Sequence, residues 1–180
     1  YRYLINNANF ESYIKVVKVD AETGKTIPFA GAGFQIFRPD GTQVVMTFTY
    51  PTVTTVDTFY TNDEGMLITP EKLEYGTGYS LVEVSAPYGY VLSNEAVSFD
   101  VTEDNSSEEN AVTVVEVRFS NMAQKGVIRI SKSGEVFASA YESGGFWQPV
   151  YEVQGLPDAV YEITAAEDIY TPDRTLRYRA

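Results

Sequence analysis

The chain has 180 residues, with 25 acidic against 13 basic side chains and a formal net charge of −12. That length fits one ordinary domain plus a remainder, or two small domains, and a hydrophobic content of 44% is that of a folded protein. The acidic balance excludes a nucleic-acid-binding surface, because phosphate binding needs clustered lysine and arginine. No apolar run approaches the length of a membrane span, so we expect no membrane insertion in this segment.

Two residue types are missing from the sequence, and their absence excludes several kinds of catalytic and metal-binding site. With no histidine and no cysteine, a Ser-His-Asp triad, a cysteine nucleophile and a zinc site of the usual ligands are excluded. A metal would have to be a hard cation held by oxygen atoms, and Asp104, Glu108 and Glu109 lack the spacing of a calcium loop. We therefore predict no metal and no cofactor. An extracellular form of this protein would need a stabilising cross-link other than a disulfide.

Short alternating segments separated by turn residues predict an all-β fold. In chain order, the clearest strands are residues 13–18, 79–83, 97–102 and 115–121, in which apolar and polar side chains alternate. Turn signals fall at residues 23–25, 39–41, 62–65, 75–78 and 87–89. About seven strands at this spacing favour an antiparallel β-sandwich over alternating strand–helix units. The acidic residues 102–111 are expected to form a loop before the last strand.

The start of the chain is repeated near its end. Residues 14–18 have the same apolar and lysine spacing as residues 128–132, and residues 31–36 match residues 158–163 at a larger offset. A repeat this long indicates tandem domains rather than a solenoid. We therefore expect three parts, namely a tail or linker from a preceding repeat over residues 1–12, one complete β-sandwich over residues 13–122, and the first half of a following repeat over residues 123–180.

Three polar side chains continue the apolar faces of their strands. Lys18, Glu83 and Asn121 each share the parity of the apolar residues that precede them. Each alone has a simpler reading, as a lysine that reaches solvent, a surface carboxylate and a turn-forming asparagine. Buried residues of these types are rare unless they are paired. Three of them in one unit point to a shared chemistry.

An amide bond between the Lys18 amine and the Asn121 side-chain carbonyl, formed with loss of ammonia, would use all three residues. Burial favours the neutral, nucleophilic form of a lysine and the protonated form of a carboxylic acid. A protonated Glu83 would hydrogen-bond the Asn121 carbonyl oxygen and pass protons to the departing ammonia, while folding supplies the proximity. Such a bond would join the first and last strands like a disulfide that cannot be reduced.

Three segments of the sequence carry a family likeness, namely Lys18–Lys25, Phe29–Phe37 and Tyr79–Tyr90. The last of them contains the E-box, the motif around Glu83. Over about residues 13–122 the chain resembles the collagen-adhesin B-type repeats, also described as SpaA-like or prealbumin-like, of Gram-positive pilins and surface adhesins. The resemblance implies tandem immunoglobulin-like sandwiches of the reversed, prealbumin-like type. It also implies a spontaneous isopeptide bond between Lys18 and Asn121, with Glu83 as the catalytic proton relay. Lys132 stands at the lysine position of the second repeat, where no E-box or closing asparagine follows.

The resemblance implies a structural stalk or pilin-like module of a bacterial cell-surface adhesin. The module would be extracellular and anchored to the cell wall through regions outside this chain, with neighbouring repeats of the same chain as its partners. It would not be an enzyme beyond a single self-cross-linking event. The sequence contains no Leu-Pro-x-Thr-Gly sorting signal and no pilin motif with its polymerising lysine, which favours an internal stalk module over a backbone pilin.

Two other functions stay open at this point. One is a ligand-binding adhesin domain that recognises a host surface protein or glycan through the aromatic residues Tyr141, Phe146, Trp147 and Tyr151, although a packing role for these residues is favoured. The other is an accessory β-sandwich of a secreted glycoside hydrolase. No carboxylate pair that the sequence can place across a cleft supports a catalytic role of that kind.

Overall fold

The computed structural model describes residues 9–172 and 174–180, and every regular element among them is a β-strand. The all-β prediction is therefore confirmed. The chain divides into two compact units. The first contains the residues up to Gln124 and the segment Tyr170–Arg177, and the second contains Lys125–Ile169 and Tyr178–Ala180. No helix that could cross a membrane occurs among the described residues.

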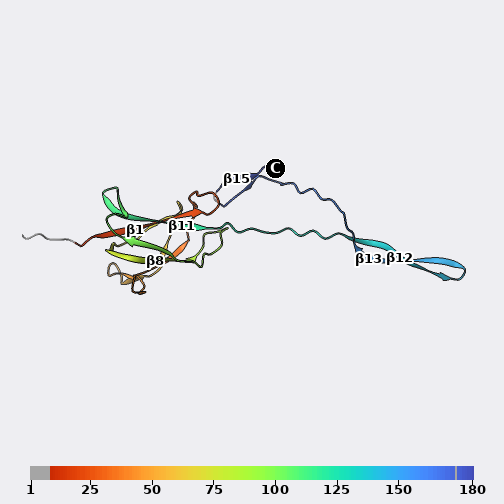
Figure 1. Ribbon diagram of the computed structural model, residues 1–180, viewed down its shortest axis with the longest axis horizontal. Helices are drawn as coiled ribbons and strands as arrows, with labels where there is room; N and C mark the ends of the chain where they lie inside the picture. The colour runs from red at the N-terminus through yellow and green to blue at the C-terminus, as the bar shows by residue number, and fades with distance from the viewer. Residues whose placement is uncertain (1–8, 173) are drawn as a thin grey trace, which may run out of the picture. The chain divides into compact units, whose positions relative to one another are not determined.

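The first unit is a β-sandwich (Figure 1). Its strands are β1 (Glu11–Asp20), β2 (Gly33–Phe37), β3 (Met46–Phe48), β4 (Thr54–Val56), β5 (Phe59–Tyr60), β6 (Met66–Ile68), β7 (Leu73–Glu74), β8 (Gly76–Ser85), β9 (Val97–Val101), β10 (Ser106–Glu109) and β11 (Val112–Asn121). One sheet has the order β10-β11-β1-β6, with β7 also pairing with β1, and the other has the order β5-β2-β8-β9. Strands β3 and β4 form a separate hairpin.

The core lies between the two sheets. It is built from inward-facing apolar side chains of both, among them Ile14, Val16, Phe34, Leu81 and Phe119, all at most 1% exposed. The alternation along each strand places these residues on one face, and two such faces packed together remove them from water. A polar side chain that points inward from one of these strands is therefore surrounded by apolar side chains.

The first and last strands of the sandwich, β1 and β11, pair directly and run parallel. Their register runs from Tyr13 opposite Val114 to Asp20 opposite Asn121. The other described pairings in the two sheets are antiparallel. A parallel pair needs a long crossover connection, which here contains all the strands from β2 to β10. Because the two strands point the same way, their C-terminal ends lie together at one edge of the sheet.

The acidic segment 102–111, which we expected to be a loop, contains a strand. Strand β10 pairs with the start of β11, and Asn110 and Ala111 form the turn with positive φ angles of 50° and 64°, as two-residue hairpin turns favour. The loop prediction was wrong because polar side chains on an edge strand stay solvated. Glu109 on β10 even forms an ion pair of 2.9 Å with Lys15 on β1. Polar composition alone does not distinguish such a strand from a loop.

The second unit contains one long hairpin, formed by β12 (Ser133–Ser143) and β13 (Phe146–Gly155). Phe137 and Tyr151 meet edge to face across it, with ring centroids 6.2 Å apart. The aromatic side chains of the hairpin are exposed, with Trp147 at 70%. Two short strands, β14 (Ile169–Tyr170) and β15 (Leu176–Tyr178), pair with each other, and most of their residues lie in the segment Tyr170–Arg177 of the first unit. That residues 123–180 form the first half of a following repeat stays a prediction.

Candidate cross-linking site

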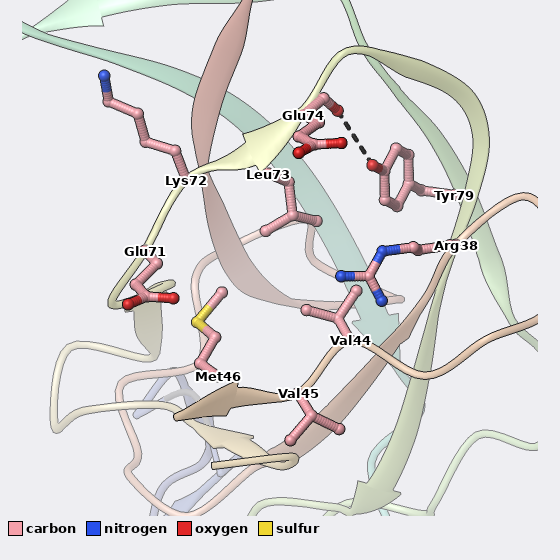
Figure 2. Close-up of a pocket in the computed structure, with 9 residues that line it drawn as sticks. All are labelled: Arg38, Val44, Val45, Met46, Glu71, Lys72, Leu73, Glu74 and Tyr79. Atoms are coloured by element: carbon pink, nitrogen blue, oxygen red, sulfur yellow. Dashed lines mark hydrogen bonds between the residues drawn. The ribbon is translucent and has the colours of Figure 1, made fainter. Parts of the chain in front are cut away.

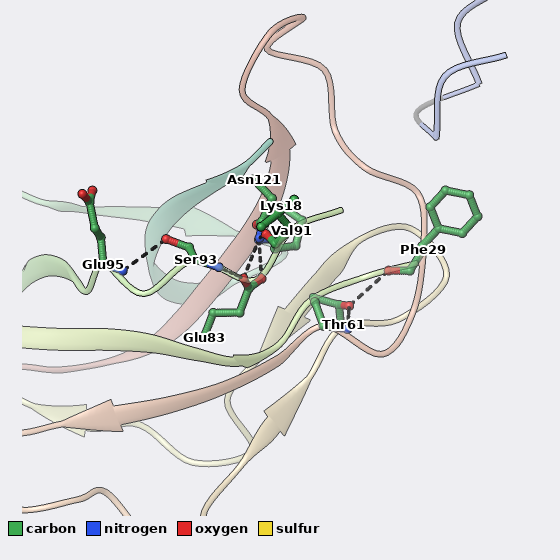
Figure 3. A network of polar contacts seen from close by, with 9 residues as sticks. Lys18, Phe29, Thr61, Glu83, Val91, Ser93, Glu95 and Asn121 are labelled. Atoms are coloured by element: carbon green, nitrogen blue, oxygen red, sulfur yellow. Dashed lines mark hydrogen bonds and ion pairs between the residues drawn. The ribbon is translucent and has the colours of Figure 1, made fainter. Parts of the chain in front are cut away.

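Lys18, Glu83 and Asn121 lie together inside the sandwich (Figure 3). Lys18 is on β1 and Asn121 is the last residue of β11, both in one sheet, whereas Glu83 comes from β8 of the other sheet. Their exposed fractions are 0%, 2% and 3% for the lysine, the asparagine and the glutamate. The alternation of the strands that suggested their inward orientation is thus found in the structure for all three side chains.

The carboxylate of Glu83 contacts both of the other side chains. Lys18 Nζ donates a hydrogen bond of 2.8 Å to Glu83 Oε1, and Asn121 Nδ2 donates one of 2.5 Å to Glu83 Oε2. The backbone N–H of Ser93 also donates to Oε2, at 2.9 Å. One carboxylate therefore holds the amine on one of its oxygens and the amide nitrogen on the other.

The Asn121 amide is oriented by a second acceptor. Its Nδ2 donates to the backbone carbonyl of Val91 at 2.8 Å, and because a carbonyl can only accept, the nitrogen must be the atom that faces it. Asn121 Oδ1 is buried and has no hydrogen-bond partner among the described residues. The sequence-based hypothesis had Glu83 bonded to the carbonyl oxygen of Asn121, but in the structure Glu83 contacts the amide nitrogen.

Burial sets the charge state of Lys18. Its side chain has no exposed surface, and Nζ lies 4.3 Å and 5.2 Å from the ring centroids of Phe119 and Phe34. Desolvation lowers the pKa of Lys18 from 10.5 to about 8, against the opposing effects of the Glu83 hydrogen bond and charge. The neutral amine, which is the nucleophilic form, is therefore far more accessible than for an exposed lysine. An amine, a primary amide and a carboxyl group between them are the groups that an amide exchange needs.

Several contacts at the site were not predicted from the sequence. The Val91 carbonyl and the Ser93 N–H are backbone groups, which no side-chain pattern marks. One side-chain pair did leave a signal, because Asp20 has the parity of Lys18 on β1 and is 2% exposed. Its Oδ2 accepts a hydrogen bond of 2.9 Å from the hydroxyl of Tyr90. The same parity argument that selected Lys18 would have selected Asp20.

Lys132, the fourth predicted residue, lies in the second unit and is exposed. No side chain in residues 9–172 and 174–180 forms a hydrogen bond or an ion pair with its amine. The structure thus does not bring Lys132 together with a carboxylate and an amide in the way it does Lys18. Its role as a second cross-linking lysine stays a prediction.

A pocket of about 150 Å³ lies in the first unit at residues other than those of the buried site (Figure 2). It is lined by Arg38, Val44, Val45, Met46, Glu71, Lys72, Leu73, Glu74 and Tyr79. The Tyr79 hydroxyl donates to the backbone carbonyl of Glu74 at 3.0 Å, and Lys72 pairs with Glu11 at 3.2 Å. Neither Lys18, Glu83 nor Asn121 lines this pocket, which is therefore separate from the candidate site.

Comparison with known proteins identifies the fold. A family model described as the SpaA prealbumin-like fold domain matches residues 12–116. Among solved structures, the group B streptococcus pilus 2b backbone protein matches with 21% identity and a TM-score of 0.50, over 63% of this chain and 41% of that chain. GBS52, the minor pilin of Streptococcus agalactiae, matches with 16% identity and a TM-score of 0.50, over 69% of this chain and 49% of that chain.

This chain therefore spans less than half the length of either solved structure. At these identities the likeness shows the shared fold alone. A search of the curated proteins found no match. The family model, in contrast, covers more than half of the chain and includes all but the first residue of β1, the whole of β8 and the first half of β11, and on that basis the protein belongs to the SpaA prealbumin-like domain family.

Proposed function

We propose that the first unit is a structural module of a bacterial surface protein or pilus, locked by a self-formed amide bond between Lys18 and Asn121. The observation that carries this proposal is the position of the Glu83 carboxylate, which holds the Lys18 amine on Oε1 and the Asn121 amide nitrogen on Oε2 inside a buried site. The family fold supports the structural role, and the solved structures of that fold described above are pilus proteins.

The reaction needs only groups of this chain. A proton passes from the Lys18 ammonium to Glu83 Oε1, and the neutral amine then attacks Cγ of Asn121. Glu83 delivers this proton to Nδ2, the Cγ–Nδ2 bond breaks, and ammonia leaves. A proton from the attacking nitrogen returns to the carboxylate. The products are one amide N–H, one ammonia and a protonated Glu83, so atoms and charge balance.

The bond would suit a load-bearing module. It would join β1 to β11, which are neighbours in one sheet and also the first and last strands of the sandwich. A pull on the two ends of the unit would then be carried by the covalent link and would bypass the strands from β2 to β10. In a chain without cysteine, such a bond would provide the constraint that disulfides provide elsewhere.

The setting we propose is extracellular, with anchoring to the cell wall through regions outside this chain. Its partners would be neighbouring modules of the same polypeptide. The module would act on no external substrate, since the proposed reaction consumes its own lysine and asparagine and happens once.

Intact-mass spectrometry of the purified chain tests this proposal. We expect the wild-type mass to be short by one ammonia, and Glu83→Ala to have its full calculated mass and a lower unfolding temperature. Glu116→Ala is the matched control, because Glu116 is a surface carboxylate on β11 whose side chain is 36% exposed, and it should still lose ammonia. The full calculated mass in folded wild-type protein would overturn the proposal.

A further inference from the structure

The connection between β8 and β9 passes directly over the buried site. We refer to its residues Pro87–Glu95 as the strap. We propose that the strap is a positioning element for the cross-linking reaction, which it aligns through the backbone carbonyl of Val91 and the backbone N–H of Ser93. This inference rests on the proposed function, because it assigns a role in the same reaction to the backbone groups of Val91 and Ser93, which lie after the segment Tyr79–Tyr90 that carries the family likeness.

The strap contacts the two groups that must exchange a proton. The Ser93 N–H donates to Glu83 Oε2 at 2.9 Å, and the Val91 carbonyl accepts from Asn121 Nδ2 at 2.8 Å (Figure 3). The two donor hydrogens of the amide nitrogen are thus taken by Glu83 and by Val91. The amide cannot rotate about its last side-chain bond without losing one of these contacts, so the leaving nitrogen stays on the carboxyl oxygen.

The strap is itself fastened to the strand end that carries Asn121. The Val91 N–H donates to the Met122 carbonyl at 2.9 Å, and the Gln124 N–H donates to the Gly89 carbonyl at 2.8 Å. Tyr90 and Ala123 form an isolated antiparallel bridge between these two bonds. The position of the strap is therefore set relative to the end of β11.

A side-chain contact fastens the strap to β1 as well. The Tyr90 hydroxyl donates to Asp20 Oδ2 at 2.9 Å, and Asp20 is the register partner of Asn121 in the parallel ladder. Asp20 lies two residues after Lys18, so this bond ties the strap to the strand that supplies the nucleophile. The strap thus fixes the positions of the Asn121 amide, the Glu83 carboxyl group and strand β1 relative to one another.

Alignment of this kind affects the rate of a reaction between groups that are already close. The terminal torsion of an asparagine has broad minima, so burial alone does not fix which amide atom faces Glu83. A misplacement of about 1 Å in a reacting group costs roughly a hundredfold in rate. Loss of the strap contacts should therefore strongly slow formation of the cross-link. The core should stay assembled, because the strap donates only one hydrogen bond to the Lys18–Glu83 ion pair.

The test follows the reaction in the full chain. The chain is made by cell-free synthesis, samples are quenched in denaturant at increasing times, and intact mass gives both the rate and the final yield of ammonia loss. Tyr90→Phe removes the bond to Asp20, and Ser93→Pro removes the N–H that donates to Glu83. Ser93→Ala is the matched control, since it keeps that N–H and removes only the hydroxyl.

We expect Tyr90→Phe and Ser93→Pro to slow ammonia loss by about tenfold or more, as the loss of a hydrogen bond to a charged group implies, and Ser93→Ala to keep the wild-type rate. A merely structural role would lower the final yield without slowing the reaction of the molecules that fold, and this result would overturn the proposal. If Ser93→Pro does not fold, the test rests on Tyr90→Phe alone. Slower ammonia loss in Tyr90→Phe, with the full final yield, then supports the proposal.

The remaining outcomes separate this inference from the proposed function. A wild-type chain that never loses ammonia overturns both. A wild-type chain that loses ammonia, with Tyr90→Phe and a folded Ser93→Pro at the same rate, overturns only the role of the strap. Equal slowing by Ser93→Ala and Ser93→Pro also overturns it, because the hydroxyl rather than the N–H would then be responsible.

Discussion

Lys18 and Asn121 lie on neighbouring parallel strands, but they are not register partners. Lys18 is opposite Phe119, and Asn121 is opposite Asp20. Residues two apart on a strand face the same side, so both side chains enter the core, where Glu83 from the facing sheet bridges them. The parallel pairing therefore brings a residue near the start of the domain to one at its end, each on a strand held in a sheet.

Substitution of Glu83 by its neutral isostere tests the buried ion pair. We expect Glu83→Gln to retain its full mass and to leave the Lys18 ammonium buried without a counter-charge, which costs about 3–5 kcal/mol in the free energy of unfolding. Adding Lys18→Met to this variant should recover most of that loss, because the substituted side chain is apolar. Denaturant unfolding of the single and double variants measures the difference. Equal stability of the two would show that the ion pair is not the cause.

The rate of cross-linking should depend on pH through Lys18. Burial lowers the pKa of Lys18 to about 8, so the ammonium predominates below that pH and the neutral amine above it. The proposed reaction uses the proton that Lys18 passes to Glu83, so we expect the rate to be nearly independent of pH below about 8 and to fall above it, where that proton is lost to the solvent. The measurement dilutes denatured, uncross-linked chain into buffers of different pH and follows ammonia loss by intact mass. A rate that instead climbs towards pH 10.5, the pKa of an ordinary lysine, would contradict this assignment.

Force spectroscopy tests the load path. In the cross-linked unit the chain between Lys18 and Asn121 cannot be extended by a pull on the ends. The Asn121→Ala variant cannot form the bond, so the chain between the two positions should extend under force. Its unit should lengthen by roughly 330–360 Å, the extended length of about a hundred residues. Glu116→Ala serves as the control that should behave as the wild type. A wild-type unit that lengthens as far as Asn121→Ala would show that no link carries the load.

Phe119 should matter both for stability and for the state of Lys18. Its ring packs edge to face on Phe34, with centroids 5.1 Å apart, and lies beside Lys18 Nζ. We expect Phe119→Ala to destabilise the unit by about 3–5 kcal/mol and to admit water, which raises the pKa of Lys18 and slows cross-linking at neutral pH. Phe146→Ala, at a side chain 73% exposed, is the control and should stay within about 0.5 kcal/mol of the wild type. Cross-linking in Phe119→Ala at the wild-type rate would contradict the role of desolvation.

The sequence was sufficient to predict the β-fold and the inward orientation of the three site residues, because both follow from alternation along single strands. Lys18, Glu83 and Asn121 each continue an apolar face, and a polar residue on such a face is conspicuous. Asp20 continues the same face of β1 as Lys18 and could have been found in the same way.

The remaining features depend on relationships between segments, which alternation does not encode. The parallel pairing of β1 with β11 joins residues about a hundred positions apart. Strand β10 has the composition of a solvated loop because it lies at a sheet edge. The backbone carbonyl of Val91 orients the Asn121 amide, and the backbone N–H of Ser93 holds the Glu83 carboxylate; backbone groups are present at every residue whatever its side chain.

The bond itself is tested most directly by tandem mass spectrometry of a tryptic digest. Trypsin does not cleave after an acylated lysine, so the cross-linked chain should yield one branched peptide in which Val16–Lys25 is joined through Lys18 to Asn121 of Phe119–Lys125, at a mass lower by one ammonia than the sum of the two. An uncross-linked chain would instead yield Val16–Lys18, Val19–Lys25 and an unmodified Phe119–Lys125. Recovery of only these three linear peptides from folded wild-type protein would contradict the account.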